Sequence, residues 1–146
     1  MSGAGHEHRH GDDRHRHEHL SHVPDAASPA VYAARAGLLF DPPARGDDVE
    51  QALRRFLAAL SSALSAAGCT LVGHIKGGVN GAGGGLAFHL TRLDAAPAIA
   101  GGHAGPVSDA ELTLNVIVFG VDEARLPALV QHAWAEGAGV AASWPD

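Results

Sequence analysis

The sequence has very little cysteine, since Cys69 is the only one in 146 residues. A disulfide framework needs at least two thiols and a cysteine-rich zinc site needs more, so both are excluded. A lone thiol in an apolar context is typical of a protein from a reducing compartment. The N-terminus also lacks the apolar stretch of a signal peptide, and we therefore expect a cytoplasmic protein.

Long apolar runs and an excess of basic charge are missing as well. No stretch reaches the roughly 18 consecutive apolar residues of a membrane-spanning helix, so we expect no membrane partner. The chain carries 16 acidic and 10 basic side chains, a formal net charge of −6. Nucleic acid is not an expected partner, because phosphate binding needs a basic face. The glycine run 77–85 joins two expected strands and lacks the P-loop pattern, which argues against a nucleotide site.

Histidine is abundant and concentrated at the N-terminus, in two H-x-H-x-H triplets and one further residue. These candidate metal ligands are His6, His8, His10, His15, His17, His19 and His22. Neutral imidazole is a favoured ligand of nickel, cobalt, zinc and copper, and histidine-rich tracts are typical of metal binding. Residues 1–29 hold almost nothing apolar to bury, so we expect a disordered metal-binding head. A solubilising tail and an affinity tag are the alternatives, although tags are usually contiguous histidines.

Residues 30–140 are predicted to form one α+β domain. Apolar spacing of three and four predicts helices over 46–68 and 121–138, and alternation predicts strands over 69–77, 86–93 and 111–120. Segment 31–43 is expected to be a short edge strand near 38–40 or a helical turn, 94–110 a mobile connector, and 141–146 a frayed tail. The predicted fold is a two-layer sandwich: an antiparallel sheet of three or four strands, with helices on one face.

Two histidines are predicted to face each other across a hairpin. Pairing Ile75 with Phe88 puts the apolar side chains of both strands on one face, and it places His74 opposite His89. Opposed residues have Cβ atoms about 4.5–5.5 Å apart, which lets two imidazoles share a metal. His103, in the expected connector, is a candidate third ligand.

The opposite, polar face of this sheet is a second candidate site. Alternation turns Leu71 toward the core and Val72 toward the polar face. Lys76, Thr113 and Asn115 also fall on the polar face and are candidate partner contacts. Three interpretations stay open: an ordinary solvated sheet face, a docking or dimerising face, or a metal site at the two histidines.

The segments CTLVGHIKGG and LTLNVIVFGVD resemble small α+β domains that accompany CobW-type metallochaperone GTPases. The matching residues are Gly73, His74, Ile75, Lys76, Asn115, Val116, Ile117 and Val118. The head is similar to the histidine-rich tails of nickel and zinc accessory proteins. The resemblance implies an accessory domain whose partner is a GTPase metallochaperone. This chain lacks the P-loop, the nucleotide-base motif and the CxCC metal motif of the GTPases, so GTP hydrolysis is expected to be absent or supplied by that partner.

The leading hypothesis is a non-enzymatic, cytoplasmic accessory protein that captures nickel, cobalt or zinc with its head. Its α+β core would dock a partner, either a GTPase metallochaperone or a second copy of itself. A small enzyme with its site at His74 and His89 on the polar sheet face is an alternative. A purely structural interaction domain, whose head serves only solubility, is another.

Overall fold

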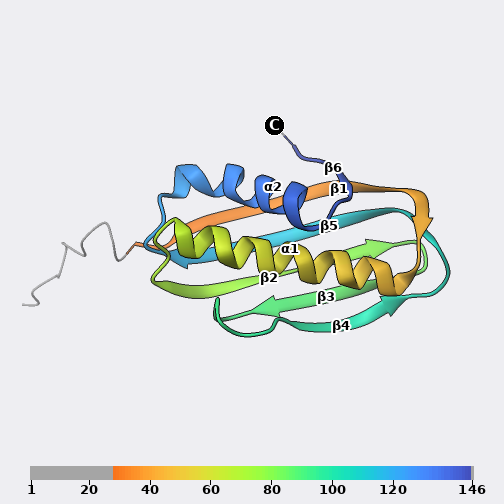
Figure 1. Ribbon diagram of the computed structural model, residues 1–146, viewed down its shortest axis with the longest axis horizontal. Helices are drawn as coiled ribbons and strands as arrows, with labels where there is room; N and C mark the ends of the chain where they lie inside the picture. Colours follow the sequence, from red (N-terminus) through yellow and green to blue (C-terminus); the bar gives the residue numbers. More distant parts are fainter. Residues whose placement is uncertain (1–27, 146) are drawn as a thin grey trace, which may run out of the picture.

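The computed structural model of the chain describes residues 28–145, so the seven histidines of the head and most of the expected disordered segment lie outside the described residues. The described chain forms six strands, two α-helices and a short 3₁₀ helix (Figure 1). In chain order these are β1 (Ala30–Ala44), α1 (Gly46–Ala66), β2 (Leu71–Gly81), β3 (Gly84–Leu90), β4 (Ala98–His103), β5 (Val107–Phe119), the 3₁₀ helix η2 (Glu123–Arg125), α2 (Leu126–Gly137) and β6 (Ala141–Ser143).

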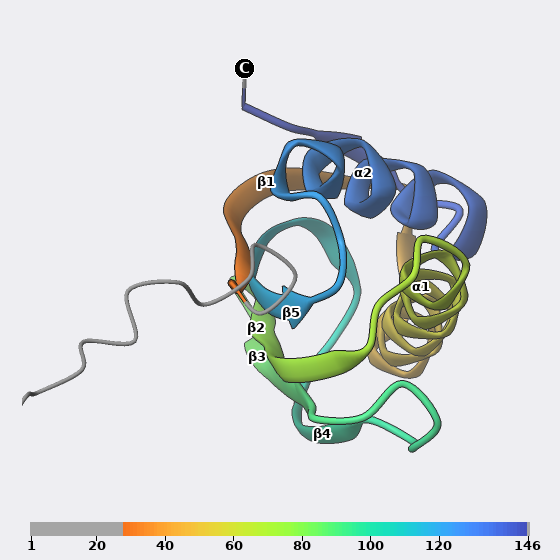
Figure 2. The same ribbon diagram turned by 90° about the vertical axis from the view of Figure 1, so that its left-hand side faces the viewer.

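The strands form one sheet in the order β4-β3-β2-β5-β1-β6, and every pair of neighbours is antiparallel. β1 and β2 therefore run parallel to each other on either side of β5, and α1 is the crossover between them. Both helices cover the same face of the sheet (Figure 2). The predicted sheet of three or four strands is wrong: the described sheet has six, because segment 31–43 does form a strand, β1, and two further strands, β4 and β6, were not expected.

β1 has 15 residues and lies inside the sheet, between β5 and β6. Ala34, Ala36, Leu38 and Phe40 are buried while their neighbours are exposed, which is the period of two of a strand. Alanine is a good helix former, and this preference hides the strand pattern in the sequence. Pairing on both sides overrides the local preference, and β6 forms where a frayed tail was expected.

The two helices pack on each other and on the sheet. α1 buries one apolar stripe with spacings of three and four, made of Val49, Ala52, Leu53, Phe56, Leu57, Leu60 and Leu64. The rings of Phe56 and Trp134 are 5.0 Å apart between centroids and inclined at 59°. The Arg55 guanidinium donates to the carbonyls of Gly137 (3.1 Å) and Ala138 (3.4 Å), which joins α1 to the C-terminal end of α2. No helix within residues 28–145 is long and apolar enough to cross a membrane.

β4 and the start of β5 occupy the segment that was expected to be a mobile connector. β4 consists mostly of alanine and glycine and pairs along β3. The chain then crosses from β4 to β5 over the β2–β3 turn, where the Ala104 N–H donates to the Gly83 carbonyl at 2.9 Å. A Cβ on Gly83 would overlap the carbonyl oxygen of Ala104, so this crossing needs glycine.

Candidate functional site

The sheet face turned away from the helices, called the outer face below, carries the polar residues singled out in the sequence. Side chains that alternate along each strand line up in rows across the sheet. From β1 toward β3 the rows contain Val31, Ile117 and His74; Ala33, Asn115, Lys76 and His89; Arg35, Thr113, Gly78 and Ala87; Gly37, Glu111, Asn80 and Gly85; and Leu39 with Asp109.

The register between β2 and β3 differs from the predicted one. Lys76, and not His74, lies opposite His89, and Ile75 pairs with Leu90. The predicted direct opposition of the two histidines is wrong, because both strands continue into the glycine run and close in a turn of two residues. The shift is by two residues, so each of these side chains keeps its expected face.

His74 reaches the outer face through a β-bulge in β2. The pairing with β5 shifts between Val72 and His74, so Gly73 is the extra residue. Val72 is therefore buried and Leu71 is 60% exposed, the reverse of the expected alternation. A Cβ on Gly73 would come within 3.0 Å of Cγ2 of Ile117, which favours glycine at the bulge. The bulge thus decides which side chains of β2 face outward.

His74, Lys76 and His89 form a basic cluster on the outer face. His74 is diagonal to His89, a relation that places neighbouring residues about 7–8 Å apart and lets two imidazoles reach one ion. The Lys76 ammonium, directly opposite His89, opposes a second positive charge there. Within residues 28–145, no three His, Cys, Asp or Glu side chains gather in a metal-binding group. A metal held by His74 and His89 would need a ligand from elsewhere.

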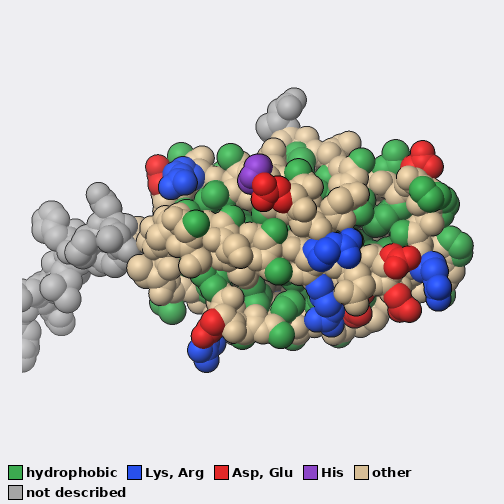
Figure 3. Space-filling view, viewed as in Figure 1, with side chains coloured by type: hydrophobic (Ala, Val, Ile, Leu, Met, Phe, Trp, Pro, Cys, Tyr) green, Lys and Arg blue, Asp and Glu red, His purple; other side chains and the backbone are tan. Residues whose placement is uncertain are grey.

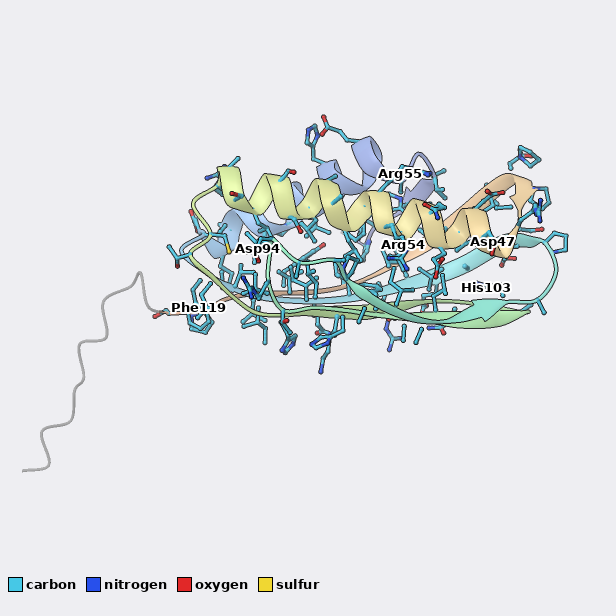
Figure 4. All side chains as sticks on the ribbon, turned by 60° about the horizontal axis from the view of Figure 1, so that its bottom comes forward. Asp47, Arg54, Arg55, Asp94, His103 and Phe119 are labelled. Atoms are coloured by element: carbon cyan, nitrogen blue, oxygen red, sulfur yellow. The ribbon has the colours of Figure 1, made fainter. Side chains whose placement is uncertain are left out.

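His103 does not join these two histidines. It ends β4 on the helix side of the sheet, near Asp47 at the start of α1 (Figure 4). Both ring nitrogens are shielded from solvent and have no hydrogen-bond partner among the described residues. A neutral imidazole carries one donor and one acceptor, so burying both without partners costs free energy.

Replacing His103 by leucine is expected to stabilise the protein. The substitution removes two unpartnered polar atoms from the interior and should raise the free energy of unfolding by about 1 kcal/mol. Urea denaturation of the two proteins at neutral pH measures the difference. His89→Leu is the matched control, because its exposed ring should give no such gain. A loss of stability in His103→Leu would show that the ring makes favourable polar contacts.

A groove of about 760 Å³ lies between α1 and the loop after β3. Leu57 and Leu93 supply apolar lining, and Ser61 is among the hydroxyl groups along it. Arg92 donates to Asp94 at 2.8 Å, and this hydrogen bond holds the pKa of the Asp94 carboxyl below its usual range. Among the described residues that line the groove, Asp94 supplies a carboxylate, and no histidine or cysteine is present. Sequence patterns did not point to this groove, because it forms between distant segments.

Charge is distributed differently on the two faces of the sheet. Acidic and basic side chains are interspersed over the helix-covered face (Figure 3). On the outer face, Lys76 lies toward one end of the strands, whereas Glu111 and Asp109 lie toward the other. Arg35 approaches Glu111 at 4.0 Å, and both side chains are exposed. Within residues 28–145, Lys76 has no carboxylate within ion-pair distance.

The two segments that carry the resemblance to accessory domains are neighbours in the sheet. His74 pairs with Ile117, and Lys76 pairs with Asn115. Comparison of the chain with family models, curated proteins and solved structures found no match. The kinship therefore stays a prediction that depends on these short segments alone.

Proposed function

We propose that this protein is a cytoplasmic, non-enzymatic accessory protein that captures a divalent transition metal, nickel, cobalt or zinc, as its cargo. The observation that carries the proposal is the pair of H-x-H-x-H triplets within the first 22 residues. Three imidazoles spaced by one residue can close around one ion, and nothing in the spacing imposes a fixed geometry. Such ligands exchange their metal readily, which suits capture and hand-over better than catalysis.

The folded part supplies a docking surface in this proposal, with Lys76, Thr113 and Asn115 as partner contacts. Its support is the position of the basic cluster relative to the start of β1, which the head precedes in the sequence. Val31, at the start of β1, shares a row with His74. His74 is thus two strands away from β1, about 10 Å.

The head is long enough to bring its metal to the basic cluster. His22 precedes the start of β1 by eight residues, which can span up to about 26 Å. His74 and His89 can therefore share an ion with a histidine of the head. The resemblance to accessory domains suggests that a GTPase metallochaperone then receives the metal.

Each triplet is expected to contribute its own share of the bound metal. Replacing His6, His8 and His10 by alanine should remove about half of it, replacing His15, His17 and His19 should do the same, and the combined variant should lose most. Equilibrium dialysis against zinc or nickel at about pH 7.5, where imidazole is neutral, measures the metal per chain. At about pH 5 the unaltered chain should release its metal, because imidazolium cannot bind a cation.

The matched control replaces Arg9, Arg14 and Arg16 by alanine. This variant changes the same segment by the same number of residues but keeps every histidine, so its metal content should not fall. The proposal is contradicted when the variant without either triplet binds as much metal as the unaltered chain.

A further inference from the structure

We propose that the outer face is the contact surface between two copies of this chain. The copies would pack face to face around a two-fold axis that lies between the two sheets. The axis runs perpendicular to the strands, along the row of Thr113 and Gly78. This inference rests on the proposed function only in taking the outer face as the docking surface. Both helices lie on the opposite face, so this one has no covering layer among the described residues (Figure 2). A two-fold contact requires a self-complementary surface, and the outer face has that property.

The charges of the outer face complement each other under this rotation, which exchanges the two ends of every strand. Lys76 lies two residues from Gly78 toward one end, and Asn80 lies two residues toward the other, beside Glu111. The rotation therefore brings Lys76 of one copy next to Glu111 of the other. It also brings the row of His74 over the row that contains Asp109. Complementary potentials of this kind fix the register of a contact.

Two exposed apolar side chains of β1 obey the same symmetry. Val31 is 46% exposed and Leu39 is 59% exposed, and each lies four residues from Arg35 on β1. The rotation places Val31 of one copy over Leu39 of the other, so both lose contact with water. Arg35 itself lies on the axis, but it leans toward Glu111 of its own chain, which keeps the two guanidinium groups apart.

The outer face has small side chains at its centre and is large enough for a stable contact. Gly78 and Ala87 share the central row with Thr113, so no bulky side chain stands between the two sheets there. Four strands spaced by about 4.8 Å, with five rows that together extend about 30 Å along the strands, give each copy an outer face of roughly 600 Å². A contact over this whole face would bury roughly 1,200 Å² for the pair. Specific interfaces between proteins bury at least about 1,000 Å² of surface in total. A hollow of about 530 Å³, lined by Ala33 and Asn115 and bordered by Pro145 of the C-terminal segment, gives a second copy room to pack there.

Charge reversal and charge exchange test the inference. The full chain should show a mass near twice its 14.9 kDa in multi-angle light scattering at the upper end of a roughly hundredfold concentration range. Lys76→Glu and Glu111→Lys should each weaken the dimer at least about tenfold, because each brings like charges together. The double variant Lys76→Glu/Glu111→Lys should restore the dimer, a rescue that general damage to the fold cannot produce.

The matched control is Arg125→Glu, a charge reversal at an exposed residue that precedes α2, outside the sheet. It should leave the mass unchanged, and circular dichroism verifies that each variant is folded. A chain that stays monomeric over the whole range contradicts the inference, as does a dimer that neither reversal weakens. A chain that dimerises only without residues 1–27 would assign the outer face to the head instead and equally overturn it.

Metal per chain is measured in the same samples, which separates the two proposals. Loss of the dimer with unchanged metal content leaves metal capture intact. Loss of metal in the triplet variants with an unchanged mass leaves the two-copy contact intact.

Discussion

Gly77→Ala is expected to destabilise the protein by at least about 3 kcal/mol, enough to leave a small domain largely unfolded under mild denaturing conditions. Gly77 lies on the core side of β2, between Phe88 of β3 and Leu114 of β5. A Cβ there would overlap the carbonyl oxygen of Thr113 and come within 2.9 Å of Cζ of Phe88. The carbonyl oxygen of Thr113 belongs to the backbone of β5, a central strand, so β2 and β5 would have to separate for the methyl group to fit.

The matched control for Gly77→Ala is Gly102→Ala in β4. An added Cβ at Gly102 meets no atom within 4 Å, so this variant should be neutral or slightly more stable. Urea denaturation of both variants and the unaltered chain measures the contrast. A Gly77→Ala protein as stable as the unaltered chain would contradict the close approach of β2 and β5 on which the outer-face rows depend.

The parts of the fold that follow from local patterns were predictable. The helix expected over 46–68 is α1 at Gly46–Ala66, because its apolar stripe repeats without interruption. The strand expected over 111–120 lies within β5, whose buried leucines and valines alternate with polar residues. In both cases, the residues that pack in the core also favour the local conformation, so propensity and packing agree.

The full length of β1 and the presence of β4 could not be predicted from local patterns in the same way. Alanine and glycine make up most of β4 and a large part of β1, and neither residue favours a strand on its own. Their conformation is imposed by pairing: β1 pairs with β5, which is distant in the sequence, and β4 pairs with β3, from which the loop 91–97 separates it. The count of three or four strands failed for this reason.

The candidate site was predictable in its chemistry but not in its geometry. Alternation alone placed Lys76, His89 and Asn115 on one polar face, where the structure has them. The register depended on how far the strands extend into the glycine run, which composition does not fix. The bulge at Gly73 and the burial of the His103 ring nitrogens without a hydrogen-bond partner among the described residues result from tertiary packing, so no local pattern predicts them.

Removal of the head is expected to abolish most metal binding and to leave the fold unchanged. Core packing starts at Ala30, so a chain that begins at residue 28 keeps every buried residue of the described core. It loses seven histidines and retains only His74 and His89 as neighbouring imidazoles. Metal held by the head alone should not stabilise the fold either, because a ligand that binds folded and unfolded chains equally leaves the unfolding equilibrium unchanged.

The most direct measurement is therefore a parallel titration of the full chain and the chain starting at residue 28 with zinc, nickel, cobalt and copper. Calorimetry gives the metal per chain, and thermal unfolding of the same samples gives the midpoint. We predict that the shortened chain binds at most about one ion per chain, through the pair of imidazoles on the outer face. Its unfolding midpoint without metal should lie within about 2 °C of that of the full chain. Equal metal content in the two chains would contradict the assignment of metal capture to the head.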